Sequence, residues 1–201
     1  MRPRQLTVGV LVVLCCVLGA RTQTRDTPST PEERQRAVRL TRKLEQAPLG
    51  QDANEDRTWL SNWIIEIPDI SVPCADMLKP LLVSEGSQYR YSKELVSQQL
   101  AGATTYMIEH PQEAKHVDQD DEDDFAINRA GVESALNAYD AIVKAGAKGA
   151  RWGPLDELVK KRQAGQLDDF VRVATLKCVS GETVMASLRP SSCAAAKGRA
   201  R

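Results

Sequence analysis

Between positions 125 and 145, apolar residues recur every three or four positions, and this spacing constrains the fold more than any other feature of the chain. The residues that share one face of a helix with 3.6 residues per turn are Val132, Ala135, Leu136, Tyr139, Ile142 and Val143. Glu133, Asn137 and Asp140 fall on the opposite, polar face. The pattern predicts an amphipathic helix over about 125–145 that ends at Gly146.

Five further segments have helical spacing together with helix start or stop signals. Thr30-Pro31-Glu32-Glu33 is a capping sequence, and Asp52 with Glu55 is a second one. The remaining predicted helices begin at Ser92, at Gly153 and near Leu167. The sequence therefore predicts an all-α fold with a single globular domain of about six helices, although the second helix includes a run, 63–67, that could also form a strand.

The segment between Pro68 and Ser92 has no regular pattern. Three prolines block any long helix through it, so we expect at most a short helix around residues 74–79. Leu81, Leu82 and Val83 are expected to pack onto the core. Alternating strands with hairpin turns are not evident, and no sheet is predicted.

Two helical architectures are compatible with these elements: an orthogonal bundle and a short helical array. Four residues of the 125–145 helix resemble the second helix of a tetratricopeptide repeat: Ala135, Tyr139, Ile142 and Val143. The resemblance implies a helical array, but it covers one helix, whereas an array needs about three units. An acidic segment stands where the first helix of such a unit should lie. We therefore expect the bundle.

The N-terminus has the order of a secretory signal peptide. Arg2 and Arg4 precede an apolar run over 6–18, and the small pair Gly19-Ala20 follows. A permanent membrane span needs ~20 apolar residues, so this run is short for one, although retention as an anchor stays open. We predict a signal peptide over 1–20 and export to the periplasm or the extracellular space.

The rest of the chain divides by composition and charge. We expect a linker over 21–29, the helical domain over 30–178 with an acidic linker at 116–124 inside it, and a disordered tail over 179–201. Loss of the signal peptide would leave the basic residues two short of the 27 acidic ones. This balance argues against nucleic acid as a partner and against stable membrane insertion after signal cleavage.

Three cysteines follow the predicted signal peptide. We expect a disulfide between Cys74 and Cys178, because both lie beside apolar residues in ordered segments, with Cys193 left over. Three unpaired thiols are the alternative. Their spacing does not fit a metal site, and the sequence indicates no cofactor.

One short motif suggests an enzyme. Glu133-Ser134-Ala135-Leu136-Asn137 resembles the opening of the lysozyme-like lytic transglycosylase motif, which implies that Glu133 would be the acid and base on a glycan bond of the envelope. Such a residue needs an apolar pocket that raises its pKa, and Glu133 is predicted to face water. The later glycine-containing segments of that family are missing from this sequence.

The acidic segment suggests a weak divalent-cation site. From Asp118, the first, third, fifth and seventh positions of a calcium loop are all acidic: Asp118, Asp120, Glu122 and Asp124. The sixth position is Asp123 instead of glycine and the twelfth is Arg129 instead of glutamate, so the segment is not an EF-hand. A metal bound by His110 and His116 is less favoured still.

Two further surfaces are candidates for binding. The basic face of the first helix could bind an acidic partner or the 118–124 segment. Tyr89 and Tyr91 could form the edge of a ligand site. With no catalytic, cofactor or metal residue assigned, we expect an exported helical binding or accessory protein whose partner is another protein or an envelope component.

Overall fold

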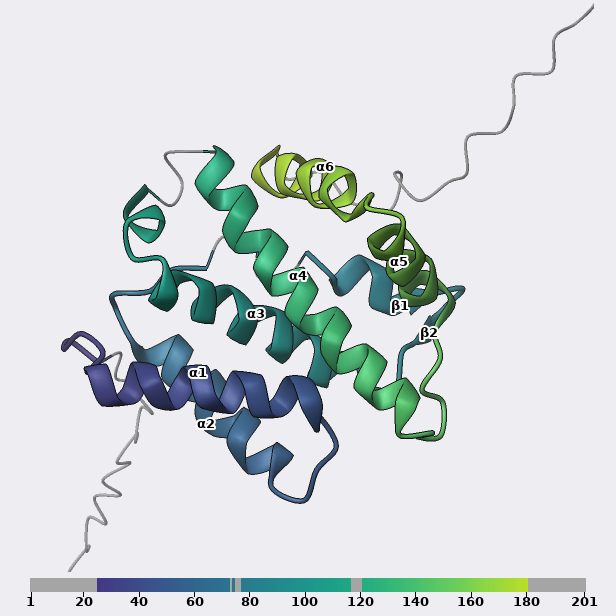
Figure 1. Cartoon of the computed structure of the whole chain (residues 1–201), viewed down its shortest axis with the longest axis horizontal. Coiled ribbons are helices and arrows are strands. Elements are labelled where there is room, and N and C mark those ends of the chain that lie inside the picture. The colour runs from purple at the N-terminus through teal and green to yellow at the C-terminus, as the bar shows by residue number, and fades with distance from the viewer. Residues whose placement is uncertain (1–24, 73, 75–76, 117–120, 181–201) are drawn as a thin grey trace, which may run out of the picture.

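The computed structural model describes residues 25–72, 74, 77–116 and 121–180. This part of the chain is mostly helical, as predicted, and contains six α-helices (Figure 1). They are α1 (Pro31–Gln46), α2 (Ala53–Glu66), α3 (Ser92–Glu109), α4 (Asp121–Lys144), α5 (Gly153–Gln163) and α6 (Leu167–Ser180). Smaller elements are the 3₁₀ helices η1 (Lys79–Leu82) and η2 (Glu113–His116) and the strands β1 (Val83–Ser84) and β2 (Ser87–Gln88).

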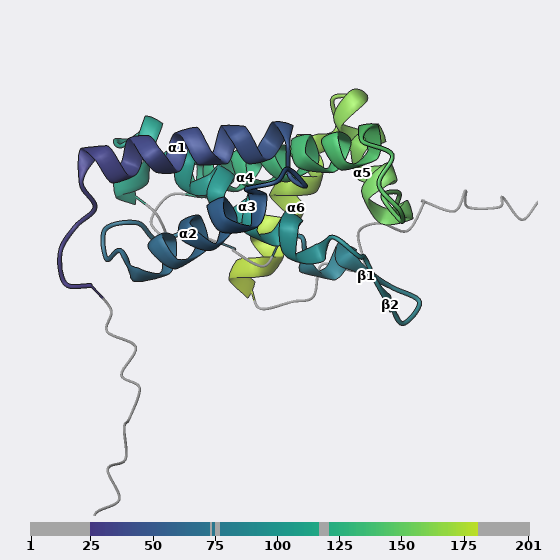
Figure 2. The same ribbon diagram turned by 90° about the horizontal axis from the view of Figure 1, so that it is seen from below.

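Helix α3 lies at the centre of the molecule. Helix α4 runs diagonally across it, while α1 and α2 lie together at one side (Figures 1 and 2). The buried residues of α3 surround the helix and include the polar Gln98, Gln99, Thr104 and Thr105. A central helix is covered from several sides, so its sequence does not show the one-sided pattern of a surface helix.

Two glycines bring α3 and α4 close together. A Cβ atom added to Gly131 would lie 2.7 Å from the carbonyl oxygen of Gln99. A Cβ atom added to Gly102 would overlap the side chain of Ser134. The crossing therefore depends on the absence of a side chain at both positions.

The core divides into two main clusters, one on each side of α3. The larger is built around α4 and includes Leu136, Tyr139 and Ile142, which α5, α6 and η1 cover. The smaller joins α1 to α2 and includes Leu44, Leu60 and Trp63. The predicted apolar face of α4 lies in the larger cluster.

The N-terminal helices confirm most of the predicted signals. The capping box of α1 is present: the Thr30 hydroxyl accepts from the backbone N–H of Glu33, and the Glu33 carboxylate accepts from the backbone N–H of Thr30. Residues 63–66 are helical and not a strand. The second capping prediction is wrong, because no side-chain hydrogen bond caps α2 at Asp52.

The predicted linker 21–29 is anchored where the structure describes it. Ser29 binds the Asp69 carboxylate through its backbone N–H at 2.8 Å and its hydroxyl at 2.7 Å. Arg34 donates to both Ser29 and Asp69. These contacts fix the start of α1 to the segment after α2. Residues 1–24, with the predicted signal peptide, lie outside the described part of the chain.

The segment before α3 forms a small hairpin over residues 83–88, which the sequence did not predict. The short helix expected around residues 74–79 includes residues 75–76, which lie outside the described part of the chain. Strands β1 and β2 pair in antiparallel register around Glu85 and Gly86, which both have positive φ, 52° and 76°. A two-residue loop with two positive φ angles is typical of a tight hairpin. Val83, predicted to enter the core, is 47% exposed on this hairpin, whereas Leu81 and Leu82 are buried as predicted.

Helices α4 and α6 are longer than the sequence predicted. Helix α4 begins at Asp121, so the predicted linker 116–124 is helical over its last four residues, and Asp124 is only 4% exposed. Helix α6 continues to Ser180, past the predicted start of the tail at 179, and residues 181–201 lie outside the described part. None of the described helices has the length and apolarity that crossing a bilayer requires.

Candidate functional site

A cleft of about 720 Å³ lies between α2, the start of α3, η1 and the hairpin. Leu82, Val83 and Val96 contribute its apolar surface. This volume falls within the range of small-ligand sites, ~300–1,000 Å³. The cleft is therefore the best candidate for a binding site in the described structure.

The polar lining of the cleft is rich in amides and hydroxyls. The amides belong to Asn54 and Asn62 of α2 and to Gln88 of β2, and the hydroxyls belong to Thr58, Ser61, Ser92 and Ser97. Among these hydroxyls, Thr58 already donates to the Asn54 carbonyl oxygen and Ser92 to the Tyr89 carbonyl oxygen. The remaining groups can donate to or accept from a ligand.

Positive charge exceeds negative charge in the cleft. Arg57, Lys79 and Lys93 line it with one carboxylate, that of Glu94. Lys93 is exposed, whereas Arg57 is half-buried and donates from Nη2 to the Pro48 carbonyl oxygen at 2.7 Å. Burial lowers the pKa of Arg57, and the charge of nearby Glu94 opposes that shift.

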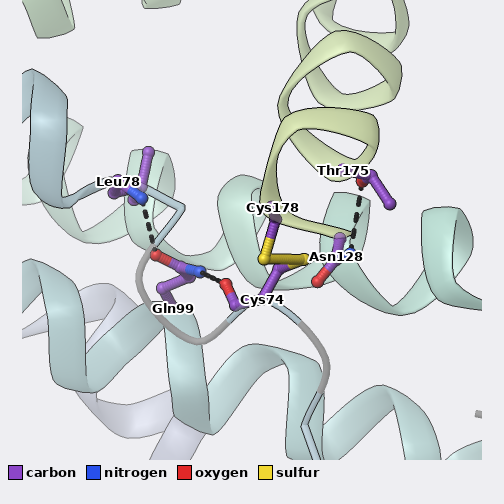
Figure 3. The surroundings of a disulfide bond; sticks show 6 residues. All are labelled: Cys74, Leu78, Gln99, Asn128, Thr175 and Cys178. Carbon is purple, nitrogen blue, oxygen red and sulfur yellow. Dashed lines mark hydrogen bonds between the residues drawn. A yellow bond between two sulfur atoms is a disulfide. The ribbon is translucent and has the colours of Figure 1, made fainter. Parts of the chain in front are cut away.

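The wall formed by η1 is fixed to α3 by Gln99. The Gln99 side chain accepts from the backbone N–H of Leu78 and donates to the carbonyl oxygen of Cys74, both at 3.1 Å (Figure 3). Cys74, whose φ is 52°, forms the predicted disulfide with Cys178 of α6, with Cα atoms 5.8 Å apart. The amide and the disulfide together hold the chain that leads into the cleft wall.

Glu133 lies on an ion-paired surface and not in an apolar pocket. Its carboxylate is 3.5 Å from the Arg162 guanidinium of α5, and its side chain is 33% exposed. Arg162 also donates to Asn137 and Asp140, so the three residues share the predicted face of α4. Arg162 was not predicted as a partner of Glu133, because no local pattern links position 162 to α4.

Ser134, next to Glu133, lies in a buried polar network. Its hydroxyl donates to the Glu45 carboxylate at 2.6 Å and accepts from the Gln98 amide at 2.9 Å. Although a serine beside a carboxylate resembles part of a nucleophilic site, Ser134 is only 3% exposed. The network joins α1, α3 and α4 and offers no access to a substrate.

The basic face of α1 is bound mainly to its own neighbours. Arg42 lies 3.2 Å from Glu109 and Lys43 lies 2.7 Å from Asp56, while Arg36 stacks on Trp59. The predicted partner segment 118–124 is described only from residue 121 onward, and within the described residues no ion pair joins Arg36, Arg42 or Lys43 to it. These contacts use much of the face that was predicted to bind an acidic partner.

The two tyrosines predicted as a ligand edge instead pack against the loop between α4 and α5. Tyr89 is 2% exposed and donates to the Ala150 carbonyl oxygen, and Tyr91 donates to the Lys148 carbonyl oxygen. Burial raises the pKa of the Tyr89 phenol well above its usual value. For Tyr89 the ligand-edge prediction is wrong.

The predicted cation segment is only partly described. Asp118 and Asp120 lie outside the described residues, whereas Glu122 and Asp124 belong to α4. His110 stacks on Tyr106 and contacts Glu113 at 3.4 Å. Within the described ranges, no group of three or more His, Cys, Asp or Glu residues is placed to hold a metal ion.

Comparison with known proteins adds no functional assignment. No family model, curated protein or solved structure matches this chain. Function must therefore be inferred from the chemistry of the cleft.

Proposed function

We propose that this chain is an exported helical protein that binds its ligand in the α2–α3 cleft and does not catalyse a reaction. The observation that carries the proposal is the cleft itself, which combines an apolar wall with amides, hydroxyls and cations. The described residues that line it include no histidine or cysteine and one carboxylate, Glu94. These groups are suited to binding and do not form a nucleophile–base pair.

Export is supported by two independent features. The order of charged, apolar and small residues over 1–20 is typical of a cleaved signal, and a disulfide such as Cys74–Cys178 persists in an oxidising compartment. Expression in a secreting host should yield an exported protein whose N-terminus lies close to Arg21. Full-length chain retained inside the cell would contradict this part of the proposal.

Binding is favoured over glycan cleavage by the surroundings of Glu133. A general acid of a glycosidase needs an apolar pocket, whereas this carboxylate has Arg162 beside it. The diagonal course of α4 across α3 also favours a bundle over a repeat array (Figure 1).

Fragment binding followed by NMR tests the location of the site. We expect small polar fragments to shift the backbone amide resonances of residues 53–62 and 92–97 together. Ser61→Trp, which fills the cleft from α2, should abolish these shifts, and Lys144→Gln, an exposed change that does not line the cleft, should leave them unchanged. Fragments that gather at another surface, or at none, would refute the proposed site.

A further inference from the structure

We propose that the α2–α3 cleft binds an acidic peptide segment, with a ligand carboxylate held between Arg57 and Lys93. The inference rests on the proposed function and names the chemistry of its ligand. Three properties of the cleft support it: its charge, the incomplete pairing of Arg57 and the mixed character of its lining.

The charge of the cleft differs from that of the whole chain. The chain has 27 basic and 27 acidic residues, whereas Arg57 and Lys93 line the cleft with a single carboxylate, that of Glu94. The first turn of α3 adds to the positive potential, because Ser92, Lys93 and Glu94 line the cleft and no side chain caps this end of the helix. The N-terminal end of a helix attracts negative charge.

Arg57 has donors that its protein contacts leave unused. A guanidinium has five N–H donors, and within the described residues Arg57 donates one hydrogen bond, to the Pro48 carbonyl oxygen. Glu94 is close enough to act on its charge but forms no ion pair with it within 4.0 Å in the described structure. A half-buried cation without a bound carboxylate is costly, and a ligand carboxylate would relieve that cost through bidentate hydrogen bonds.

The remaining lining fits a peptide. Amides at Asn54, Asn62 and Gln88 can pair with both the N–H and the C=O groups of a peptide backbone, and Val83 and Val96 offer contacts to aliphatic side chains. A nucleotide or a glycan commonly stacks on an aromatic ring, and no aromatic residue is among those that line this cleft. The lining therefore favours an acidic and aliphatic peptide.

Two end-capped hexapeptides test the inference on the purified chain. The first is acetyl-Ala-Glu-Val-Glu-Leu-Ala-amide, and the second replaces both glutamates with glutamine. In an NMR titration, we expect the acidic peptide to shift the amides of residues 53–62 and 92–97. The glutamine peptide should bind at least ~10-fold more weakly, since a charge-assisted hydrogen bond is worth about a factor of ten or more.

Substitutions of single basic residues test whether the preference for the acidic peptide arises in the cleft. Lys93→Gln should weaken the acidic peptide ~3–10-fold without changing the fold, because Lys93 is exposed. Arg57→Gln should weaken it more, with the melting temperature measured because Arg57 also holds Pro48. Lys144→Gln, an equal loss of charge outside the cleft, should leave the affinity unchanged.

The outcomes separate the two proposals. Equal binding of both hexapeptides, no binding at millimolar concentration, or the same shifts with inorganic phosphate alone would overturn the acidic-peptide inference. If fragments still occupy the cleft in those cases, the proposed binding site stands. If neither fragments nor peptides shift the cleft resonances, both proposals fail.

Discussion

The crossing of α3 and α4 predicts an unusual response to alanine at Gly131. Alanine normally stabilises a helix interior by about 1 kcal/mol relative to glycine. At Gly131, however, the new Cβ would lie 2.7 Å from the Gln99 carbonyl oxygen and 3.2 Å from the Ala103 Cβ. Because the closest atom belongs to the backbone, it cannot rotate away, and the two helices must separate.

The expected magnitude follows from these two opposing effects. Overpacking of a core costs about 1–3 kcal/mol, which outweighs the gain in helix propensity when the contact is with backbone. Gly131→Ala should therefore lower the free energy of unfolding by about 1–2 kcal/mol, which corresponds to a fall in melting temperature of ~2–8 °C. Urea unfolding followed by circular dichroism at 222 nm measures this change.

Matched variants distinguish the loss of stability caused by the close crossing from any general effect of replacing a helical glycine with alanine. Gly153, the first residue of α5, has no neighbouring heavy atom within 4 Å of an added Cβ, so Gly153→Ala should change stability by less than about 1 kcal/mol. At Gly102 the obstacle is the Ser134 side chain, and Ser134→Gly should therefore offset part of the cost of Gly102→Ala, with a coupling of ~0.5–3 kcal/mol. A Gly131→Ala protein as stable as the wild type would refute the close crossing.

Three other predictions concern the disulfide and two perturbed side chains. Replacing Cys74 and Cys178 together with alanine removes a cross-link of sequence separation 104, so urea unfolding should show a loss of up to about 4.8 kcal/mol by chain entropy. The Arg25 guanidinium and the Thr30 N–H lower the pKa of Glu33 to about 2, below its ordinary 4.5. Stability from Glu33 is thus lost as pH falls from about 4.5 to 2, and acid unfolding of Glu33→Gln should lack this component. Burial raises the pKa of Tyr139 to about 12, so the folded state retains a proton that the unfolded state loses above pH 10; stability should fall between pH 10 and 12, and less steeply in Tyr139→Phe.

Elements with a one-sided apolar pattern could be predicted from the sequence. The capping box at Thr30 and the stripe that includes Leu136 and Tyr139 gave helices whose predicted faces are buried. The pairing of Cys74 with Cys178 was also predicted, because both cysteines lie beside apolar residues in segments expected to be ordered. In each case, the decisive information lies in residues that are close together in the sequence.

The cleft could not be predicted, because it depends on contacts between distant segments. On α2, the polar residues Asn54, Thr58 and Ser61 recur at helical spacing opposite the apolar stripe, a pattern that also fits an ordinary solvated face. Only the approach of α3 and the hairpin makes them one wall of a cleft. The hairpin had a local signal in the Glu85-Gly86 pair, although its two-residue strands are too short to show alternation.

Gln99 contacts three features of the structure: the close helix crossing, the disulfide-bonded Cys74 and the cleft wall. Its backbone carbonyl oxygen faces Gly131, and its side chain holds Leu78 and Cys74 at the entrance to η1. A shift of α3 away from α4 would therefore move the amide that positions the cleft wall, in addition to loosening the core. The small size of residue 131 thus contributes to the shape of the cleft, although Gly131 does not line it. This connection explains why a glycine, which is unfavourable inside a helix, and a buried glutamine, whose amide needs hydrogen-bond partners, belong to the same structural unit.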